Sequence, residues 1–333
     1  MKVATLLPAA TLFFLSPWVG EVISGFLTAG QFLEPSRLLI TLPPYGCGAL
    51  IARELMVRHH KGWPGLLMFG LAFGIFFEGI ITRVFVNPDP GILAPQEVAY
   101  QRVLGWNWAN TIGITHFHAL LAIVTPVFLT EMLFPKYRRE SWISRPMLWG
   151  CCIVMLVWPF VLGRFANYLP PLPVILSALL LTGFFLALGL RLPTRIFRSE
   201  YRKVFHPFWL WLVCTIAMAL IMIAGSAIPG SDAPPPLPLL LGTMFAVITL
   251  EFAILAILTN GSSFGDRHRL AMVLGWLTFF LFFSLAKEIE AKELTQRGLS
   301  AGTMALLLLF LCLRSKAEDI RMDGKHRERS GTS

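Results

Sequence analysis

The sequence predicts an all-α protein, a polytopic membrane helix bundle of about ten transmembrane helices. Three observations predict it. Charged residues make up 14% of the 333 positions, against about 25% in ordinary soluble domains. The mean hydropathy is +0.67. Long apolar runs recur along the whole chain and alternate with short basic loops. A chain this apolar needs lipid as its solvent over most of its length.

Ten apolar runs come close to the roughly 20 residues that a spanning helix needs. They lie near residues 4–27, 38–56, 63–84, 110–134, 145–167, 170–190, 207–228, 236–259, 269–287 and 297–313. The first run has no clear small-x-small cleavage site, so we interpret it as a retained span and not as a signal peptide. The second run contains Pro43-Pro44, and the tenth is short.

The basic residues indicate the orientation. If Lys2 is cytoplasmic and the spans alternate, about three quarters of the 28 Lys and Arg fall on one side, as the positive-inside rule requires. Arg53, Arg58 and Lys61, for example, fall at the inner end of the second run. This predicts an integral, multi-pass protein of the cell membrane with both termini in the cytoplasm. We therefore interpret the net charge of +9 as a consequence of membrane topology. The predicted partners are membrane lipids and not nucleic acid.

The predicted domain organisation is simple. Residues 1–315 form one transmembrane domain, with polar-site spans within 1–168 and apolar scaffold spans in 169–315. Residues 316–333 are charged and predicted to be a disordered cytoplasmic tail. All five cysteines lie inside apolar runs, which argues against a disulfide framework or a zinc finger.

Ionisable groups inside spans cost about 2.5–3.5 kcal/mol each on insertion scales, so each one needs a partner or a role. The predicted spans hold Glu21, Glu78, His116, His118, Arg164 and Glu251. Counting about 1.5 Å per residue places all but Glu251 in one layer toward the outer face. Glu251 falls deeper, on the inner side. Glu131 and Arg83 lie near span ends, where they are expected to reach the interface.

The spacing of residues along each helix predicts the direction in which their side chains point. Gly70, Gly74 and Glu78 are four residues apart and share one face, so Glu78 should point into the bundle against a neighbouring helix. In the next span His118 shares a polar stripe with threonines, while His116 points to the opposite face. The two histidines therefore cannot chelate one metal as a regular helical pair, and no metal site is predicted.

The second run adds Pro43-Pro44-Tyr45-Gly46-Cys47-Gly48 at a similar depth. Two prolines and two glycines are expected to kink or unwind a helix there. Broken backbone at membrane depth is tolerated where protein or a wet cavity surrounds it, and in transporters it often makes the binding site.

We predict Glu78 and His118 as catalytic residues. The predicted substrate-binding residues are Glu21, Asn107, Thr111, Thr115 and Arg164. The carboxylate, the imidazole and the guanidinium of Arg164 would meet around a shared pocket. The sequence leaves the cofactor open.

Phe77-Glu78-Gly79 and Thr115-His116-Phe117-His118-Ala119-Leu120 resemble the CAAX-protease and bacteriocin-processing family of intramembrane peptidases. The resemblance implies that a glutamate-bearing span faces histidine-bearing spans and that the glutamate activates water. The family has two adjacent glutamates and an arginine four residues after the second, whereas this chain has one glutamate, with Arg83 five residues later. Over its whole length the chain looks like the uncharacterised multi-pass membrane proteins of bacteria.

Three functions follow from the polar layer. One is an intramembrane hydrolase, similar to a peptidase, that acts on a lipid or a membrane peptide. The second is a secondary transporter or permease for a small molecule or ion. The third is a non-catalytic assembly subunit in which the polar layer only locks helices together. The residues leave the choice, including whether the protein is an enzyme, open.

Overall fold

The computed structural model describes residues 5–89, 102–163, 168–194, 196, 205–227, 235–260, 264–291, 302 and 304–312. Every regular element in these ranges is helical. The elements are α1 (Leu6–Pro17), η2 (Trp18–Ile23), α2 (Ala29–Leu33), α3 (Pro35–Arg58), α4 (Trp63–Phe76), η3 (Phe77–Ile81), α6 (Trp108–Phe117), η4 (His118–Val124), α7 (Thr125–Leu133), η5 (Pro135–Tyr137), α8 (Arg145–Gly163), α9 (Leu172–Arg191), α10 (Pro207–Met222), η6 (Ile223–Ala227), α11 (Leu237–Leu258) and α12 (Asp266–Ala291).

Seven helical segments are long and apolar enough to cross a membrane. They are Leu6–Ile23, Trp63–Ile81, Trp108–Leu133, Arg145–Leu162, Leu172–Arg191, Pro207–Gly225 and Leu237–Leu258. The predicted fold class, an all-α polytopic bundle, is therefore confirmed. Helices α3 and α12 have 24 and 26 residues but are not among the seven. The number of ten spans therefore stays a prediction. The predicted tail after residue 315 lies outside the described residues.

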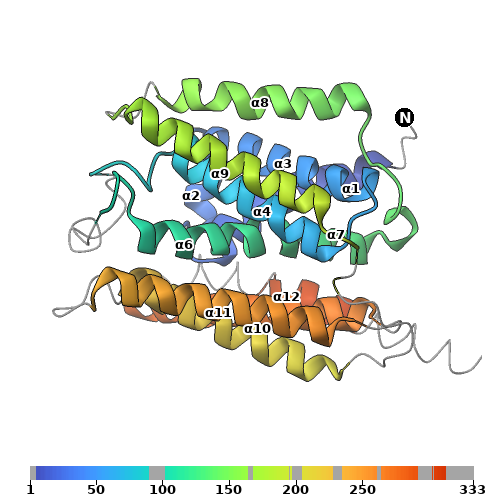
Figure 1. Ribbon diagram of the computed structural model, residues 1–333. Helices are drawn as coiled ribbons and strands as arrows, with labels where there is room; N and C mark the ends of the chain where they lie inside the picture. The colour runs from blue at the N-terminus through green and yellow to red at the C-terminus, as the bar shows by residue number, and fades with distance from the viewer. Residues whose placement is uncertain are drawn as a thin grey trace, which may run out of the picture.

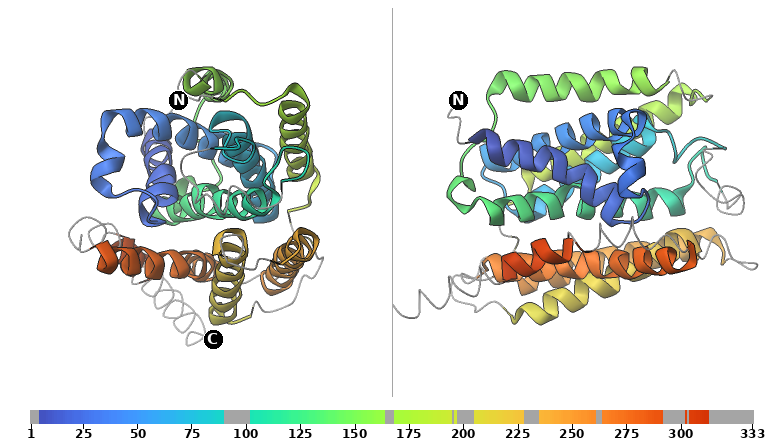
Figure 2. Two further views of the ribbon diagram at one scale, coloured as in Figure 1. Left: turned by 90° about the vertical axis from the view of Figure 1, so that its left-hand side faces the viewer. Right: turned by 180° about the vertical axis from the view of Figure 1, so that it is seen from behind.

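The helices run side by side (Figure 1), with α8 along one edge of the bundle and α10, α11 and α12 together on the opposite side. Figure 2 shows the same separation in two further views. Helix α6 begins at the left of Figure 1 and α7 ends at the right. We call these the α6 end and the α7 end of the bundle. The turns after α3, α7, α9 and α11 all meet at the α7 end.

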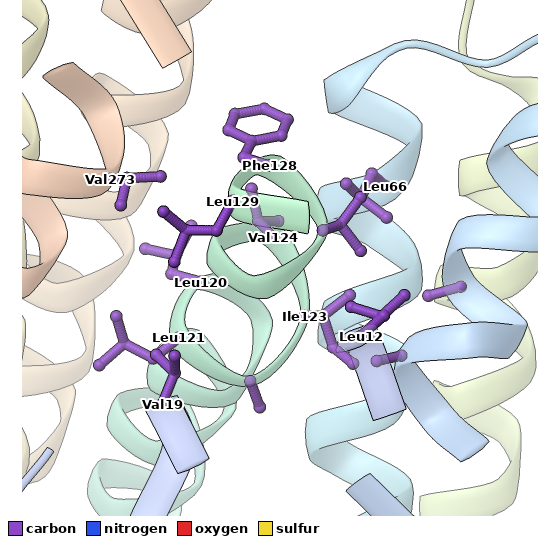
Figure 3. Packing of buried hydrophobic residues seen from close by; sticks show 14 of the residues in the cluster. Leu12, Val19, Leu66, Leu120, Leu121, Ile123, Val124, Phe128, Leu129 and Val273 are labelled. Atoms are coloured by element: carbon purple, nitrogen blue, oxygen red, sulfur yellow. The ribbon is translucent and has the colours of Figure 1, made fainter. Parts of the chain in front are cut away.

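The helix made of η4 and α7 forms the centre of the bundle. Its side chains reach neighbours on several sides, as Figure 3 shows. Leu12 of α1, Leu66 of α4 and Val273 of α12 pack around it, and each is fully buried. In the apolar 18-residue stretch of the span that contains it, Trp108–Leu133, 89% of the residues are buried. A polar group on this helix is therefore held by protein and not by lipid.

Of the kink or unwinding expected at Pro43-Pro44, the unwinding was wrong, because α3 is one continuous helix from Pro35 to Arg58. Proline has no N–H, so Pro44 cannot pair with the carbonyl of Ile40. Trp158 of α8 donates its indole N–H to that carbonyl instead, at 3.3 Å. A neighbouring helix thus replaces the lost backbone donor, which is how prolines are tolerated inside membrane helices.

The two glycines that follow these prolines serve close packing. A Cβ atom built on Gly46 would lie 2.3 Å from the ring of Phe13, and one on Gly48 would lie 2.4 Å from the ring of Phe73. Both rings therefore rest directly on the backbone of α3. This packing holds the helix against α1 and α4 where the sequence suggested a break.

Candidate functional site

Three of the predicted ionisable residues lie in π-helical segments. Glu21 lies in η2, Glu78 in η3, and His118 begins η4. Single π-helical turns inside α-helices are rare and often occur at functional sites. Each turn inserts one residue into the backbone repeat, which re-aims the side chains around it. The sequence pattern did not indicate these turns.

The segment η4 has an identifiable local cause. Pro126 cannot donate to the carbonyl of Ala122, and Ser16 of α1 donates its hydroxyl to that carbonyl at 2.6 Å. Ser16 is completely buried. The irregular backbone after His118 is therefore stabilised by a side chain from another helix.

Glu78 and His118 form a buried pair. The Nε2 atom of His118 lies 2.7 Å from Oε1 of Glu78, and Thr82 donates its hydroxyl to Oε2 at 2.5 Å. The residues Glu78 and His118 are 8% and 2% exposed. The glycine face works as predicted, since a Cβ on Gly74 would lie 3.1 Å from Cβ of His118. The carboxylate thus points into the bundle and meets the imidazole.

Tyr45 of α3 joins this pair to Glu21. Its hydroxyl donates to Oε1 of Glu21 at 2.5 Å and lies 3.4 Å from Nδ1 of His118. The four side chains therefore form one hydrogen-bonded chain from Glu21 through Tyr45 and His118 to Glu78. We call this chain the buried relay. The role of Tyr45 could not be predicted from the sequence, because one tyrosine in an apolar run carries no periodic signal.

Aromatic rings surround the imidazole of His118. The rings of Tyr45, Phe73, Phe77 and Phe117 have centroids 5.1–6.0 Å from it, mostly edge to face. Low-polarity surroundings strengthen each hydrogen bond in the relay and make an unpaired polar group costly. The buried relay is therefore sensitive to the loss of any one link.

The remaining predicted site residues lie elsewhere. Asn107 caps α6, where its side chain accepts from the backbone N–H of Asn110, and Thr111 donates back to the carbonyl of Asn107. The hydroxyl of Thr115 is buried without a hydrogen bond among the described residues. Arg164 lies outside the described residues. The structure therefore brings together the predicted carboxylate and imidazole, and says nothing about the guanidinium.

A second buried pair involves His116, whose side chain points away from His118 as predicted. Its Nε2 atom lies 3.1 Å from Oε2 of Glu251 on α11. The indole of Trp276 donates to the other carboxylate oxygen at 2.9 Å. The expectation that Glu251 stands apart from the histidine layer was wrong, because depth counted along one helix does not reveal its tertiary partner. These three residues line a cavity of about 180 Å³ between α4, α6, α11 and α12.

Buried charges also occupy the α7 end. Arg53 and Glu54 are completely buried, and Arg53 stacks over the ring of Trp142 at 3.6 Å from its centroid. Oε1 of Glu54 accepts from the backbone N–H of Trp142 at 2.7 Å, and Oε2 accepts from Arg58 at 2.8 Å. These contacts clamp the loop after α7 onto α3. Arg53 was counted from the sequence as an inner-end cation, and the sequence showed neither its burial nor its partner.

Glu131 does not reach the interface as expected from its place near a span end. It is 2% exposed, and its Oε2 lies 3.1 Å from Arg269 of α12. Beside it Arg138 binds both oxygens of Asp266, at 2.7 and 2.8 Å. These pairs tie α12 to α7, which single-sequence reasoning could not place together. Arg83, the other span-end residue, donates to the carbonyl of Tyr168.

Among the described residues, no three His, Cys, Asp or Glu side chains cluster so that they could share a metal ion. The two cavities described here, at the α7 end and beside Glu251, are lined by neither Glu78 nor His118. What the site offers is a chain of proton donors and acceptors that is half-buried at Glu21 and buried at the other three side chains.

Comparison with known proteins identifies the family of the chain. The model of an uncharacterized membrane protein family matches residues 10–314. The chain belongs to this family. The match covers most of α1 and all of α2 to α12, and together with the seven apolar helices it supports an integral, multi-pass membrane protein.

A more limited similarity links the chain to serpentine receptor class gamma-13 of Caenorhabditis elegans. The two are 28% identical over 121 residues, which is 35% of this chain and 33% of the receptor. The chain thus matches about a third of the receptor's length. No solved structure matches the chain.

Proposed function

We propose that this protein is a secondary transporter that couples the movement of a small molecule or ion to protons. The observation that supports this is the buried relay, in which four titratable side chains from four separate helical segments follow one another at hydrogen-bond distance. Chains of Asp, Glu and His inside membrane bundles are typical of pumps and transporters. A purely structural contact needs one partner for Glu78, whereas here the contacts continue to Glu21.

The proposed roles follow from the contacts. Glu78 would carry the proton, His118 would exchange it between Nε2 and Nδ1, and the hydroxyl of Tyr45 would connect the imidazole to Glu21. The π-helical segments η3 and η4 would supply the local movement, since such turns are frequent at functional sites. Asn107, Thr111, Thr115 and Arg164 remain the proposed substrate contacts.

The protein would lie in the cell membrane with both termini in the cytoplasm, as the distribution of basic residues predicts. The α7 end would then face the cytoplasm and the α6 end the outside. A reporter enzyme fused to the C-terminus that is active only in the cytoplasm tests this orientation. Activity of a reporter that works only outside the cytoplasm would overturn it.

The relay is tested by proton uptake into proteoliposomes that contain the purified full chain and enclose the dye pyranine. A potassium gradient with valinomycin sets the potential, and a panel of amino acids, sugars and organic anions is added outside. We expect one class of compound to drive acidification in the wild type. Glu78→Gln and Tyr45→Phe should each reduce the rate at least about tenfold, because each breaks the relay while keeping its shape.

Tyr137→Phe is the matched control, because the hydroxyl of Tyr137 makes no hydrogen bond with the described residues. This variant should acidify the lumen at the wild-type rate. Equal rates in the wild type and Glu78→Gln, or no proton movement with any compound, would contradict the proposal.

A second candidate is an intramembrane hydrolase with Glu78 as base and His118 as a second acid or base. The direct contact of Glu78 with His118 favours it, since a general base and its partner must lie within hydrogen-bond reach. The resemblance of both segments to intramembrane peptidases points the same way. Mass spectrometry of proteoliposomes supplied with membrane peptides and phospholipids tests it. Cleavage that is lost in Glu78→Gln, without proton uptake, would favour the hydrolase over the transporter.

A further inference from the structure

The largest cavity described here lies at the α7 end, away from the buried relay. Its volume is about 890 Å³, in the range of small-molecule binding sites. It is formed where the turns after α3, α7, α9 and α11 meet. Its polar wall carries five Lys and Arg side chains and one carboxylate, and these are Lys61, Lys136, Arg138, Arg139, Arg269 and Glu131. The cavity is therefore strongly basic.

Two of these cations have no partner in the part of the chain that the structure describes. Lys136 and Arg139 make no hydrogen bond or ion pair there. Three others are already engaged, since Arg138 binds Asp266, Arg269 binds Glu131, and Lys61 donates to the carbonyl of Leu192. The three engaged cations are held in place by their partners. Lys136 and Arg139, which have no partner among the described residues, give the cavity an excess of positive charge.

Unsatisfied buried atoms lie on the same wall. The Nε atoms of Arg138 and Arg269 and Oε1 of Glu131 are buried and make no hydrogen bond among the described residues, with Nε of Arg138 3.9 Å from Oε2 of Glu131. A buried donor without a partner is costly, so an acceptor is expected beside it. The positive-inside rule explains why basic residues occur at this end. The rule does not explain why five basic residues line one cavity, or why buried guanidinium nitrogens in it make no hydrogen bond among the described residues.

The cavity lining also includes the apolar side chains of Val57, Trp63, Phe128 and Phe264, and the last two lie beside the guanidinium of Arg269. A ligand that fits must combine several anionic oxygens with an apolar or planar part. Phosphate oxygens suit guanidinium and ammonium donors best, because they accept several charge-assisted hydrogen bonds at once. We propose that this cavity binds a phosphate-bearing ligand, either a soluble phosphorylated molecule or the headgroup of an anionic lipid. The proposal is independent of the buried relay.

The test measures binding to the purified full chain. Two probes distinguish the sources: inorganic pyrophosphate, added to protein in neutral detergent, and phosphatidic acid, added to protein in phosphatidylcholine nanodiscs. Thermal unfolding and isothermal calorimetry report each one. We expect saturable binding of at least one probe, and removal of two charges in Lys136→Gln/Arg139→Gln should weaken it at least about tenfold.

Arg145→Gln/Arg191→Gln is the matched control. Both residues are exposed basic residues at the same end of the bundle, and neither lines the cavity. This variant removes the same charge and should bind like the wild type. Binding of pyrophosphate identifies a soluble ligand, and binding of phosphatidic acid alone identifies a lipid. No binding of either probe, or equal weakening in both double variants, would overturn the proposal.

Discussion

The imidazole of His118 lies between two groups that approach its two nitrogens from different helices. Glu78 of η3 meets Nε2 at 2.7 Å, and the hydroxyl of Tyr45 faces Nδ1 at 3.4 Å. One ring nitrogen of a neutral imidazole donates while the other accepts, so a change at one side alters what the other side can do. The contacts of this one residue therefore connect three helical segments, α3, η3 and η4, through hydrogen bonds.

Two replacements of Glu78 should distinguish what its hydrogen bonds contribute to stability from what its packing contributes. Glu78→Gln keeps an oxygen that accepts from Thr82, so we expect its stability to stay within about 1 kcal/mol of the wild type. Glu78→Leu leaves Nε2 of His118 without its carboxylate partner and Thr82 with the longer hydrogen bond to the carbonyl of Phe77, and it should cost about 1–3 kcal/mol. Thermal unfolding of the purified protein in detergent measures both. Equal stability of the two variants would show that the pair does not contribute to folding.

The packing of α4 on η4 predicts a strong difference between two glycines. A Cβ on Gly70 would lie 2.8 Å from the Cα and carbonyl oxygen of Ala119, which are backbone atoms and cannot move aside. Gly70→Ala should therefore destabilise the protein by about 1–3 kcal/mol.

The control for this change is Gly183→Ala on α9, because nothing lies within 4 Å of a Cβ there. That variant should be neutral or up to about 1 kcal/mol more stable, since alanine favours helix. Unfolding midpoints of both variants check the prediction. A neutral Gly70→Ala would mean that α4 and η4 are less tightly packed than described.

Glu54 should be essential for folding. Glu54→Ala removes the partner of two arginines and of the backbone N–H of Trp142, and it leaves the buried Arg53 with the more distant carboxylate of Glu131, at 3.8 Å. Breaking such a pair costs about 3–5 kcal/mol. Glu140→Ala, which removes an exposed carboxylate from the same loop, should have little effect. The folded yield on size-exclusion chromatography distinguishes them, and a monodisperse Glu54→Ala protein would refute the prediction.

Much of the fold could be predicted from the sequence because membrane helices are encoded locally. Apolar runs of sufficient length mark the spans, and the spacing of Gly70, Gly74 and Glu78 gives the face that meets the next span. The same spacing argument correctly turned His116 away from His118. The effect of the prolines on α3 could not be predicted in the same way. Whether a proline breaks a helix depends on a donor from another helix, such as the indole of Trp158.

The sequence by itself determined that the chain is a membrane helix bundle with polar groups inside its spans, because both follow from the order of apolar and charged residues. Only the tertiary structure decided which of these groups meet. Tyr45 reaches Glu21 and His118, Glu251 reaches His116, and Arg269 reaches Glu131 across 24 to 138 residues of chain. Helix packing sets such contacts, and nothing in the local spacing of one sequence reports which helix faces which.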